Sequence, residues 1–158
     1  METIYVRNVH DAFLRGMDLF RHNAVRTQES RAGLTLEFKT PVTTTYKKPN
    51  ERVIFWKERD ANPFFHFFEG LWMLAGREDC AYLTWFNKRM SEFSDNGLNL
   101  NGAYGYRWKT HFGKDQLEVI VSRLRNDPND RRCVLAIWDC IYDLDRASLD
   151  TPCNTHIY

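Results

Sequence analysis

The chain has 158 residues, a net charge of +1 and a composition that is 43% hydrophobic and 27% charged. This balance predicts a soluble globular protein with a real core, and it excludes attraction to nucleic acid or membranes by bulk charge. No stretch approaches the roughly 20 apolar residues that a membrane-spanning helix needs, and the N-terminus lacks the apolar core of a signal peptide. We therefore expect a cytoplasmic protein with a single domain over residues 1–158.

The four cysteines, at positions 80, 133, 140 and 153, form no CxxC pair. A zinc site is therefore not expected, and neither is a disulfide-rich secreted domain at this length. The plainest interpretation is four reduced thiols, most of them buried.

The N-terminal third of the chain predicts one helix followed by extended segments. Apolar residues within 8–22 recur at the spacing of an amphipathic helix. Residues 23–33 are polar and predict a loop. Residues 34–38 alternate between apolar and polar side chains, which predicts a strand, and residues 41–45 are expected to be extended.

A second helix is predicted to begin at Asn62-Pro63, because an asparagine cap is followed by a proline in the first turn. The helix should run to Ala75, with Gly76 as its C-terminal stop. It is apolar nearly all round, so we expect a buried central helix. Glu69 is the charge inside it, and a carboxylate there is costly unless it is paired or useful.

The rest of the sequence predicts two further helices, a turn and a strand. The helices are expected over 79–93 and 115–125, and residues 101–105 predict a glycine-punctuated turn. Residues 132–138 are largely apolar and predict a strand buried on both faces. The whole pattern is that of a mixed α+β fold.

Three residues have two interpretations each. Cys153 follows a proline at the predicted start of a strand, and it is either a buried structural thiol or a nucleophile beside cationic side chains. Glu69 is either a paired structural carboxylate or a general acid and base whose pKa is raised by burial. Tyr104 either fills a turn or offers its hydroxyl group to a ligand.

Four arginines are candidates for binding an anion. Arg131 and Arg132 are either an ordinary surface pair before a strand or two guanidinium groups that fork onto a phosphate. Arg26 and Arg31, in the polar segment 23–33, allow the same two interpretations.

Taken together and in order, these segments resemble the thymidylate synthase family, which includes the pyrimidine nucleotide hydroxymethylases. The resemblance runs through nearly the whole chain, and its anchors include Phe68-Glu69-Gly70-Leu71-Trp72, Gly102-Ala103-Tyr104-Gly105, Asp130-Arg131-Arg132 and Pro152-Cys153. It implies a thymidylate synthase-like mixed β-sheet with the buried central helix. Members of the family continue well past the cysteine, so we expect the C-terminal part to be missing from this chain.

The resemblance also implies a mechanism. Cys153 matches the thiol that adds to C6 of a pyrimidine nucleoside monophosphate, so that C5 can take a one-carbon unit from 5,10-methylenetetrahydrofolate. Glu69 matches the glutamate that manages proton transfers around the base and the folate, with Trp72 beside the cofactor. Tyr104 matches a tyrosine near the thiol.

The resemblance further implies how the nucleotide phosphate is held. Arg26 or Arg31 matches the arginine of the phosphate-binding loop. Arg131 and Arg132 match a pair that reaches the phosphate bound by the partner subunit, which implies an obligate homodimer. Neither a membrane nor direct binding of nucleic acid is expected.

Two departures from the family bear on the product. Asn154 stands where synthases usually carry a histidine, and Ser91 and Ser94 stand where they carry a tryptophan pair near the folate. A dry wall favours hydride transfer, whereas a polar wall lets water trap the exocyclic methylene. The sequence therefore favours hydroxymethylation of dCMP or dUMP over thymidylate synthesis. A truncated, non-catalytic nucleotide-binding module and a purely structural fragment are the alternatives.

Overall fold

The computed structural model describes residues 2–22, 25–30 and 33–157. The chain divides into two compact units, Met1–Ala61 and Asn62–Tyr158. Both units contain helices and strands, as the predicted α+β class requires. The single domain over 1–158 stays a prediction. Within the described ranges, no helix has both the length and the apolar character needed to cross a membrane.

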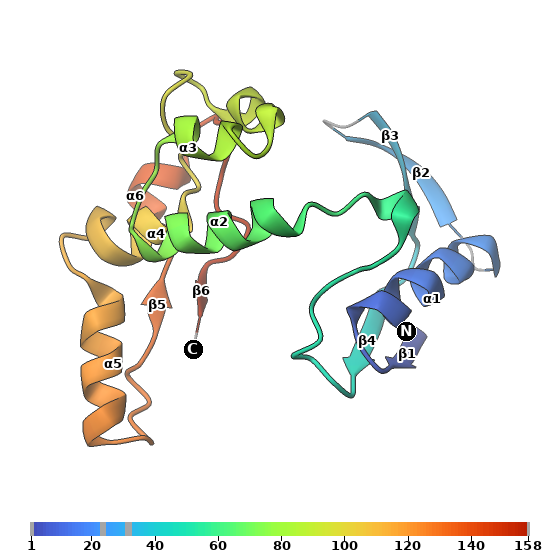
Figure 1. The fold of residues 1–158 in the computed structure, drawn as a ribbon, viewed down its shortest axis with the longest axis horizontal. Coiled ribbons are helices and arrows are strands. Elements are labelled where there is room, and N and C mark those ends of the chain that lie inside the picture. The colour runs from blue at the N-terminus through green and yellow to red at the C-terminus, as the bar shows by residue number, and fades with distance from the viewer. Residues whose placement is uncertain (1, 23–24, 31–32, 158) are drawn as a thin grey trace. The chain divides into compact units, whose positions relative to one another are not determined.

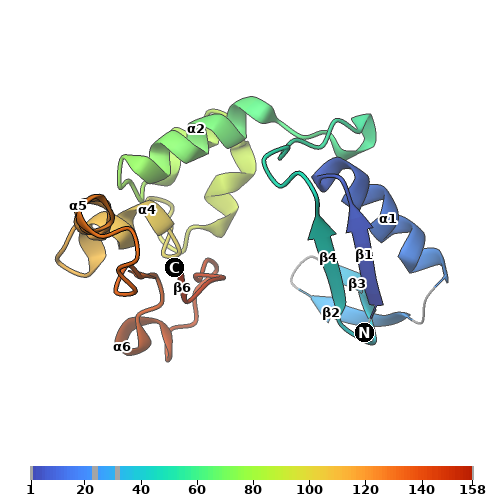
Figure 2. The same ribbon diagram turned by 90° about the horizontal axis from the view of Figure 1, so that it is seen from below.

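The first unit sets an amphipathic helix beside a parallel pair of strands (Figure 2). β1 (Glu2–Val6) pairs with β4 (Val42–Tyr46) in register from Glu2 opposite Val42 to Val6 opposite Tyr46. α1 (Val9–His22) contacts β1. The predicted helix over 8–22 and the extended segment over 41–45 are confirmed, whereas β1 was not predicted.

An antiparallel hairpin completes the first unit. β2 (Val25–Ser30) pairs with β3 (Gly33–Phe38), and Val25 lies opposite Phe38. β3 confirms the strand predicted over 34–38. The loop predicted over 23–33 is wrong for residues 25–30 and for Gly33, and residues 23–24 and 31–32 lie outside the described residues. The side chains of β2 are exposed on both faces except at Val25, so this strand lacks the apolar alternation by which strands are recognised.

In the second unit, α2 (Pro63–Leu74) begins and ends where the sequence predicts. The side-chain oxygen of Asn62 accepts a hydrogen bond from the N–H of Phe65 at 3.0 Å, and Pro63 occupies the first turn. Gly76 follows the helix with a left-handed φ of 70°.

The prediction that α2 is buried is wrong for this chain. Trp72 is its one buried residue, while Phe64, Phe67 and Leu74 are 70%, 62% and 62% exposed. α2 contacts α3 (Cys80–Thr84) and α4 (Tyr104–Tyr106), seen beside it in Figure 1. Within the second unit, these contacts leave apolar side chains of α2 such as Phe64, Phe67 and Leu74 exposed.

The helix predicted over 79–93 is two shorter helices. α3 begins after Asp79, whose side chain accepts a hydrogen bond from the N–H of Tyr82. A 3-10 helix follows over Lys88–Phe93. Asn87 separates them, because its side-chain oxygen accepts from the N–H of Arg89 and so caps a new helix in the middle of the predicted one.

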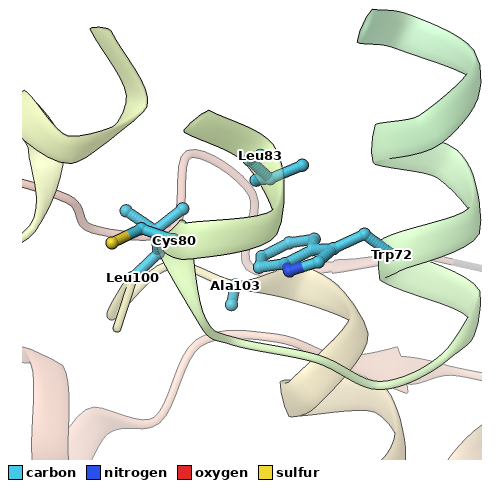
Figure 3. Packing of buried hydrophobic residues seen from close by; sticks show 5 residues of the cluster. All are labelled: Trp72, Cys80, Leu83, Leu100 and Ala103. Carbon is cyan, nitrogen blue, oxygen red and sulfur yellow. The ribbon is translucent and has the colours of Figure 1, made fainter. Parts of the chain in front are cut away.

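The core of the second unit lies between α2, α3 and the start of α4 (Figure 3). It consists of Trp72, Cys80, Leu83, Leu100 and Ala103. The indole N–H of Trp72 donates to the backbone oxygen of Asp79 at 2.9 Å, so its buried polar atom is satisfied. This packing fixes α3 against the C-terminal half of α2.

α4 crosses α2 at backbone contact. Gly105 is buried there, and a Cβ atom at this position would lie 2.0 Å from the backbone oxygen of Met73. A side chain at 105 would therefore separate the two helices. α4 continues into a π-helical turn over Arg107–His111, so the turn predicted over 101–105 ends before Tyr104, which lies in a helix.

A buried ion pair ties this segment to the C-terminal region. Arg107 donates to both carboxylate oxygens of Asp143, at 2.5 and 2.8 Å, and the two side chains are 1% and 3% exposed. Arg107 also donates to the backbone oxygens of Asn101 and Ile137. One guanidinium group thus joins the turn before α4 to the strand region after α5 (Gln116–Asn126).

The C-terminal elements are shorter than predicted. α5 is capped by Asp115 and confirms the helix over 115–125. β5 (Leu135–Ala136) pairs antiparallel with β6 (His156–Ile157), and α6 (Cys140–Asp143) lies between them in the chain. The strand predicted over 132–138 is correct in place but wrong in length and burial, since Val134 is 42% exposed.

Parallel and antiparallel pairing both occur, but in separate sheets. The described residues form two-stranded sheets of order β1-β4, β2-β3 and β5-β6. The single mixed β-sheet expected from the resemblance is therefore not assembled by these residues, although the mixture of helices with small sheets keeps the α+β class.

Candidate active site

A cavity of about 190 Å³ in the second unit brings together Glu69, Trp72, Tyr104 and Cys153. Glu69 and Trp72 come from α2, Tyr104 begins α4, and Cys153 lies in the segment before β6. The other residues that line it are Met73, Leu83, Met90, Leu100, Gly102, Ala103, Asp150 and Thr151. These four candidates are separated by up to 84 positions in the sequence, and the fold places them around one cavity.

Tyr104 and Cys153 are in direct contact. The phenol oxygen of Tyr104 accepts a hydrogen bond from the backbone N–H of Cys153 at 3.2 Å and another from the side-chain amide of Asn154 at 3.4 Å. Pro152 is buried, whereas Cys153 is exposed. The prediction that Cys153 begins a strand is wrong, because β6 starts at His156. An accessible thiol on an anchored backbone is suited to attack a ligand in the cavity.

Glu69 is half-buried on α2, and no described residue hydrogen-bonds its carboxylate. Burial raises the pKa of Glu69 above its ordinary value of 4.5, and the neighbouring His66 opposes this shift. A carboxyl group with a raised pKa in a cavity can hold and release a proton closer to neutral pH.

Asp150 is a cavity residue that the sequence did not single out. Its carboxylate accepts a hydrogen bond from the backbone N–H of Gly102 at 2.8 Å. The two residues are 48 positions apart, so no local pattern could reveal the contact. The sequence could have marked Asp150 as a candidate site residue, because it is a charged residue three positions before the candidate nucleophile Cys153.

Arg26 lies in the first unit and Arg31 lies outside the described residues. Arg26 faces Glu37 across the β2–β3 ladder, and its guanidinium group donates to the Glu37 carboxylate at 3.0 Å. This cross-strand pair lowers the pKa of Glu37. The phosphate role of either arginine therefore stays a prediction.

Arg131 and Arg132 are exposed, and neither lines the cavity that holds Cys153. Arg132 donates to both oxygens of Asp130 at 2.9 and 3.0 Å, and Arg123 donates to the same carboxylate at 3.0 Å. These cations hold the pKa of Asp130 well below its usual range. Within the described ranges, Arg131 has no ion-pair partner and projects from the segment before β5.

The two serines expected to make a polar wall do not line this cavity. Ser94 is buried, and its hydroxyl group donates to the backbone oxygen of Asn99 at 2.7 Å. Ser91 bonds to the backbone oxygen of Lys88. Met90 is the residue of this segment that reaches the cavity. The polar part of the wall is made by Glu69, Tyr104, Asp150, Thr151 and Cys153 instead.

Comparison with known proteins supports the pattern of residues. The family model described as thymidylate synthase matches residues 17–158. The chain is 49% identical over 154 residues to the deoxyuridylate hydroxymethyltransferase of Pseudomonas phage M6, covering 98% of this chain and 44% of that protein. It is 37% identical over 125 residues to the deoxyuridylate hydroxymethyltransferase of Bacillus phage SP01, covering 72% of this chain and 33% of that protein. The chain thus spans less than half the length of these curated relatives.

Proposed function

Because the chain belongs to the thymidylate synthase family, we propose that the protein transfers a one-carbon unit to C5 of deoxyuridylate and releases a 5-hydroxymethyl nucleotide. The observation that carries this proposal is the cavity that joins Cys153, Tyr104 and Glu69. The two phage relatives bear the name of this activity and support uracil over cytosine and hydroxymethyl over methyl as the product.

In this mechanism Cys153 adds its sulfur to C6 of the pyrimidine, and C5 becomes the nucleophile. The hydrogen bond from the Cys153 N–H to the Tyr104 phenol fixes the backbone that carries the sulfur. Such anchoring lowers the cost of bringing thiol and ring together, because fewer rotations are lost on binding. The side-chain amide of Asn154 donates to the same oxygen, so the phenol of Tyr104 holds two consecutive residues, Cys153 and Asn154.

Glu69 manages the proton that C5 must lose. Its half-buried carboxyl group has a raised pKa, so protonated and ionised forms are closer in energy than for a solvated glutamate. The same group can therefore accept a proton at one step and return it at another.

The residues present fit 5,10-methylenetetrahydrofolate, the cofactor that the family implies. Met90 offers an apolar surface beside the Glu69 carboxylate, which suits a flat ring bearing N–H groups, whereas Trp72 and Leu83 line the cavity from the core and are only 3% and 1% exposed. When bound, the folate supplies the one-carbon unit. Since the cavity of about 190 Å³ is smaller than the roughly 300–1,000 Å³ of common ligand pockets, it accounts for the reacting end of a ligand alone.

Arg131 and Arg132 are assigned to the nucleotide phosphate of a partner subunit in a homodimer. Both are exposed and lie outside the cavity of their own chain, as this assignment requires. Arg26 or Arg31 is assigned to the phosphate within the same chain. A cytoplasmic location, expected from the sequence, is part of the same proposal.

The test is release of tritium from C5-tritiated dUMP and dCMP, each with methylenetetrahydrofolate, followed by the mass of the product. Release from dUMP with a hydroxymethyl mass supports the proposal. A methyl mass would make the protein a thymidylate synthase. No release from either nucleotide, with retained nucleotide binding, would favour a non-catalytic binding module.

A further inference from the structure

Asp150 gives the cavity a second carboxylate, in an environment unlike that of Glu69. Asp150 and Glu69 are the acidic residues among those that line the cavity. Glu69 has no hydrogen bond from a described residue, whereas Asp150 accepts the backbone N–H of Gly102 at 2.8 Å. Two carboxyl groups in different environments of one site can take different proton-transfer roles, as in several well-known enzymes.

The orientation of Asp150 depends on a glycine. A Cβ atom at position 102 would lie 2.9 and 3.0 Å from the two carboxylate oxygens of Asp150, so any other residue would displace the carboxylate. Glycine at this position lets the carboxylate lie directly against the backbone that leads into Tyr104.

The residues immediately before Asp150 are anchored by hydrogen bonds. The Ser148 hydroxyl group contacts the backbone oxygen and N–H of Asp150, at 3.0 and 3.3 Å, and the carboxylate of Asp95 at 2.6 Å. The N–H of Leu149 donates to Asp95 at 3.0 Å. Asp150 is therefore held in the wall with little freedom to turn away.

From this geometry we infer that Asp150 is the residue that directs the reaction to the hydroxymethyl product, by binding and deprotonating the water that attacks the one-carbon unit. The inference rests on the proposed function. The serines that the sequence suggested for a polar wall do not line the cavity, whereas Asp150 does, three residues before Cys153.

The step balances without any oxidant or reductant. The starting species is the nucleotide joined to Cys153 through C6, with an exocyclic methylene on C5. The water oxygen bonds to the methylene carbon as Asp150 takes a proton from that water. The electron pair of the exocyclic double bond becomes the C5–C6 double bond, the C6–S bond breaks, and the sulfur leaves as a thiolate.

The experiment compares Asp150→Asn with the unaltered full chain in single turnovers with C5-tritiated dUMP and methylenetetrahydrofolate. Asparagine keeps an oxygen for the Gly102 N–H but cannot accept the proton. Tritium release should stay within about threefold, while the hydroxymethyl product forms about 100-fold more slowly, the usual range for losing a general base. Asp145→Asn, an exposed carboxylate in the same region, is the matched control and should change neither rate.

Gly102→Ala displaces the Asp150 carboxylate without changing Asp150 itself. It should slow product formation more than tritium release. Covalent trapping by 5-fluoro-dUMP reports whether Cys153 is still correctly placed. Loss of trapping in Asp150→Asn, or product that forms as fast as tritium is released, would overturn the role of Asp150 alone. No tritium release from the unaltered protein would overturn the proposed function, and with it this inference.

Discussion

The phenol oxygen of Tyr104 accepts the backbone N–H of Cys153 at 3.2 Å, across 49 positions of sequence. The contact joins the first residue of α4, in the middle of the second unit, to the segment before β6, where the candidate nucleophile lies.

Tyr104→Phe removes the acceptor without removing the ring. We expect the rate of covalent trapping to fall about 3- to 10-fold, the worth of one hydrogen bond, with nucleotide affinity nearly unchanged. The rate is measured by quenching the reaction with 5-fluoro-dUMP at a series of times and quantifying the covalent adduct by mass spectrometry. Tyr142→Phe, which changes an exposed ring outside the cavity, serves as the control. Equal trapping rates in Tyr104→Phe and the unaltered protein would remove Tyr104 from the site.

Cys153→Ser replaces the thiol by a hydroxyl group of similar size. Turnover should fall by more than about 1,000-fold, while the dissociation constant for the nucleotide stays nearly the same, because the binding groups are intact. Calorimetry and the tritium assay measure the two quantities. Cys140→Ser changes another exposed cysteine outside the cavity and should leave both unaltered. Full activity in Cys153→Ser would eliminate the covalent mechanism.

Glu69→Gln should change how the stability of the fold depends on pH. Because burial raises the pKa of Glu69 above 4.5, its protonated form is favoured by folding. Its contribution to stability is full below the unfolded pKa and is lost as pH rises through the folded pKa. As pH rises from the unfolded to the folded pKa of Glu69, the unaltered protein should therefore lose unfolding free energy relative to Glu69→Gln. Denaturant titrations at a series of pH values measure it, and a constant difference would contradict the raised pKa.

Arg132→Ala should weaken binding of the nucleotide by about 10- to 100-fold and leave binding of the nucleoside unchanged, because only the phosphate contact is removed. Arg125→Ala, an exposed cation on α5, is the control. An equal loss for nucleoside and nucleotide would show that the phosphate assignment is wrong.

The homodimer predicts complementation between inactive variants. If Arg131 and Arg132 act on the partner's site, mixing the double arginine-to-alanine variant with Cys153→Ser should restore about a quarter of the activity, since half the random dimers contain one intact site. Activity that stays at zero, with subunit exchange verified by mass, would place both arginines in the site of their own chain.

Arg107→Met should destabilise the fold by about 3–5 kcal/mol, because it leaves the buried Asp143 carboxylate without its partner. Burial by itself would raise the pKa of Asp143, but the Arg107 guanidinium group lowers it below 3.8. This stability is therefore present above the unfolded pKa and is lost as pH falls through the folded one. Urea titrations measure the effect. Arg89→Met, in an exposed pair with Glu92, should cost less than about 1 kcal/mol.

What the sequence predicted well depends on local contacts. Asn62 and Asp115 cap helices through bonds to residues three positions away, so composition and spacing suffice to place α2 and α5. The cysteine, the glutamate and the tyrosine were found because their neighbours resemble a known family. The structure adds that all three line one cavity.

What the sequence missed depends on contacts that spacing does not encode. β2 is exposed on nearly every residue, so its strand character comes from the ladder with β3 and leaves no apolar alternation to read. The exposure of α2 reflects which surfaces the described residues cover, which no property of the helix itself determines. Asp150 joins the cavity through Gly102, a partner that only the fold brings near.

Because of the crossing at Gly105, the shape of the cavity can change without a change in the spacing between α2 and α4. Because backbone meets backbone there, the spacing between the helix with Glu69 and the helix with Tyr104 does not depend on any rotamer. Substitutions at wall positions such as Met90 or Leu100 can therefore reshape the space offered to a ligand while the two reactive groups keep their separation. Selection for new substrates would act on the wall, and position 105 would tolerate no variation.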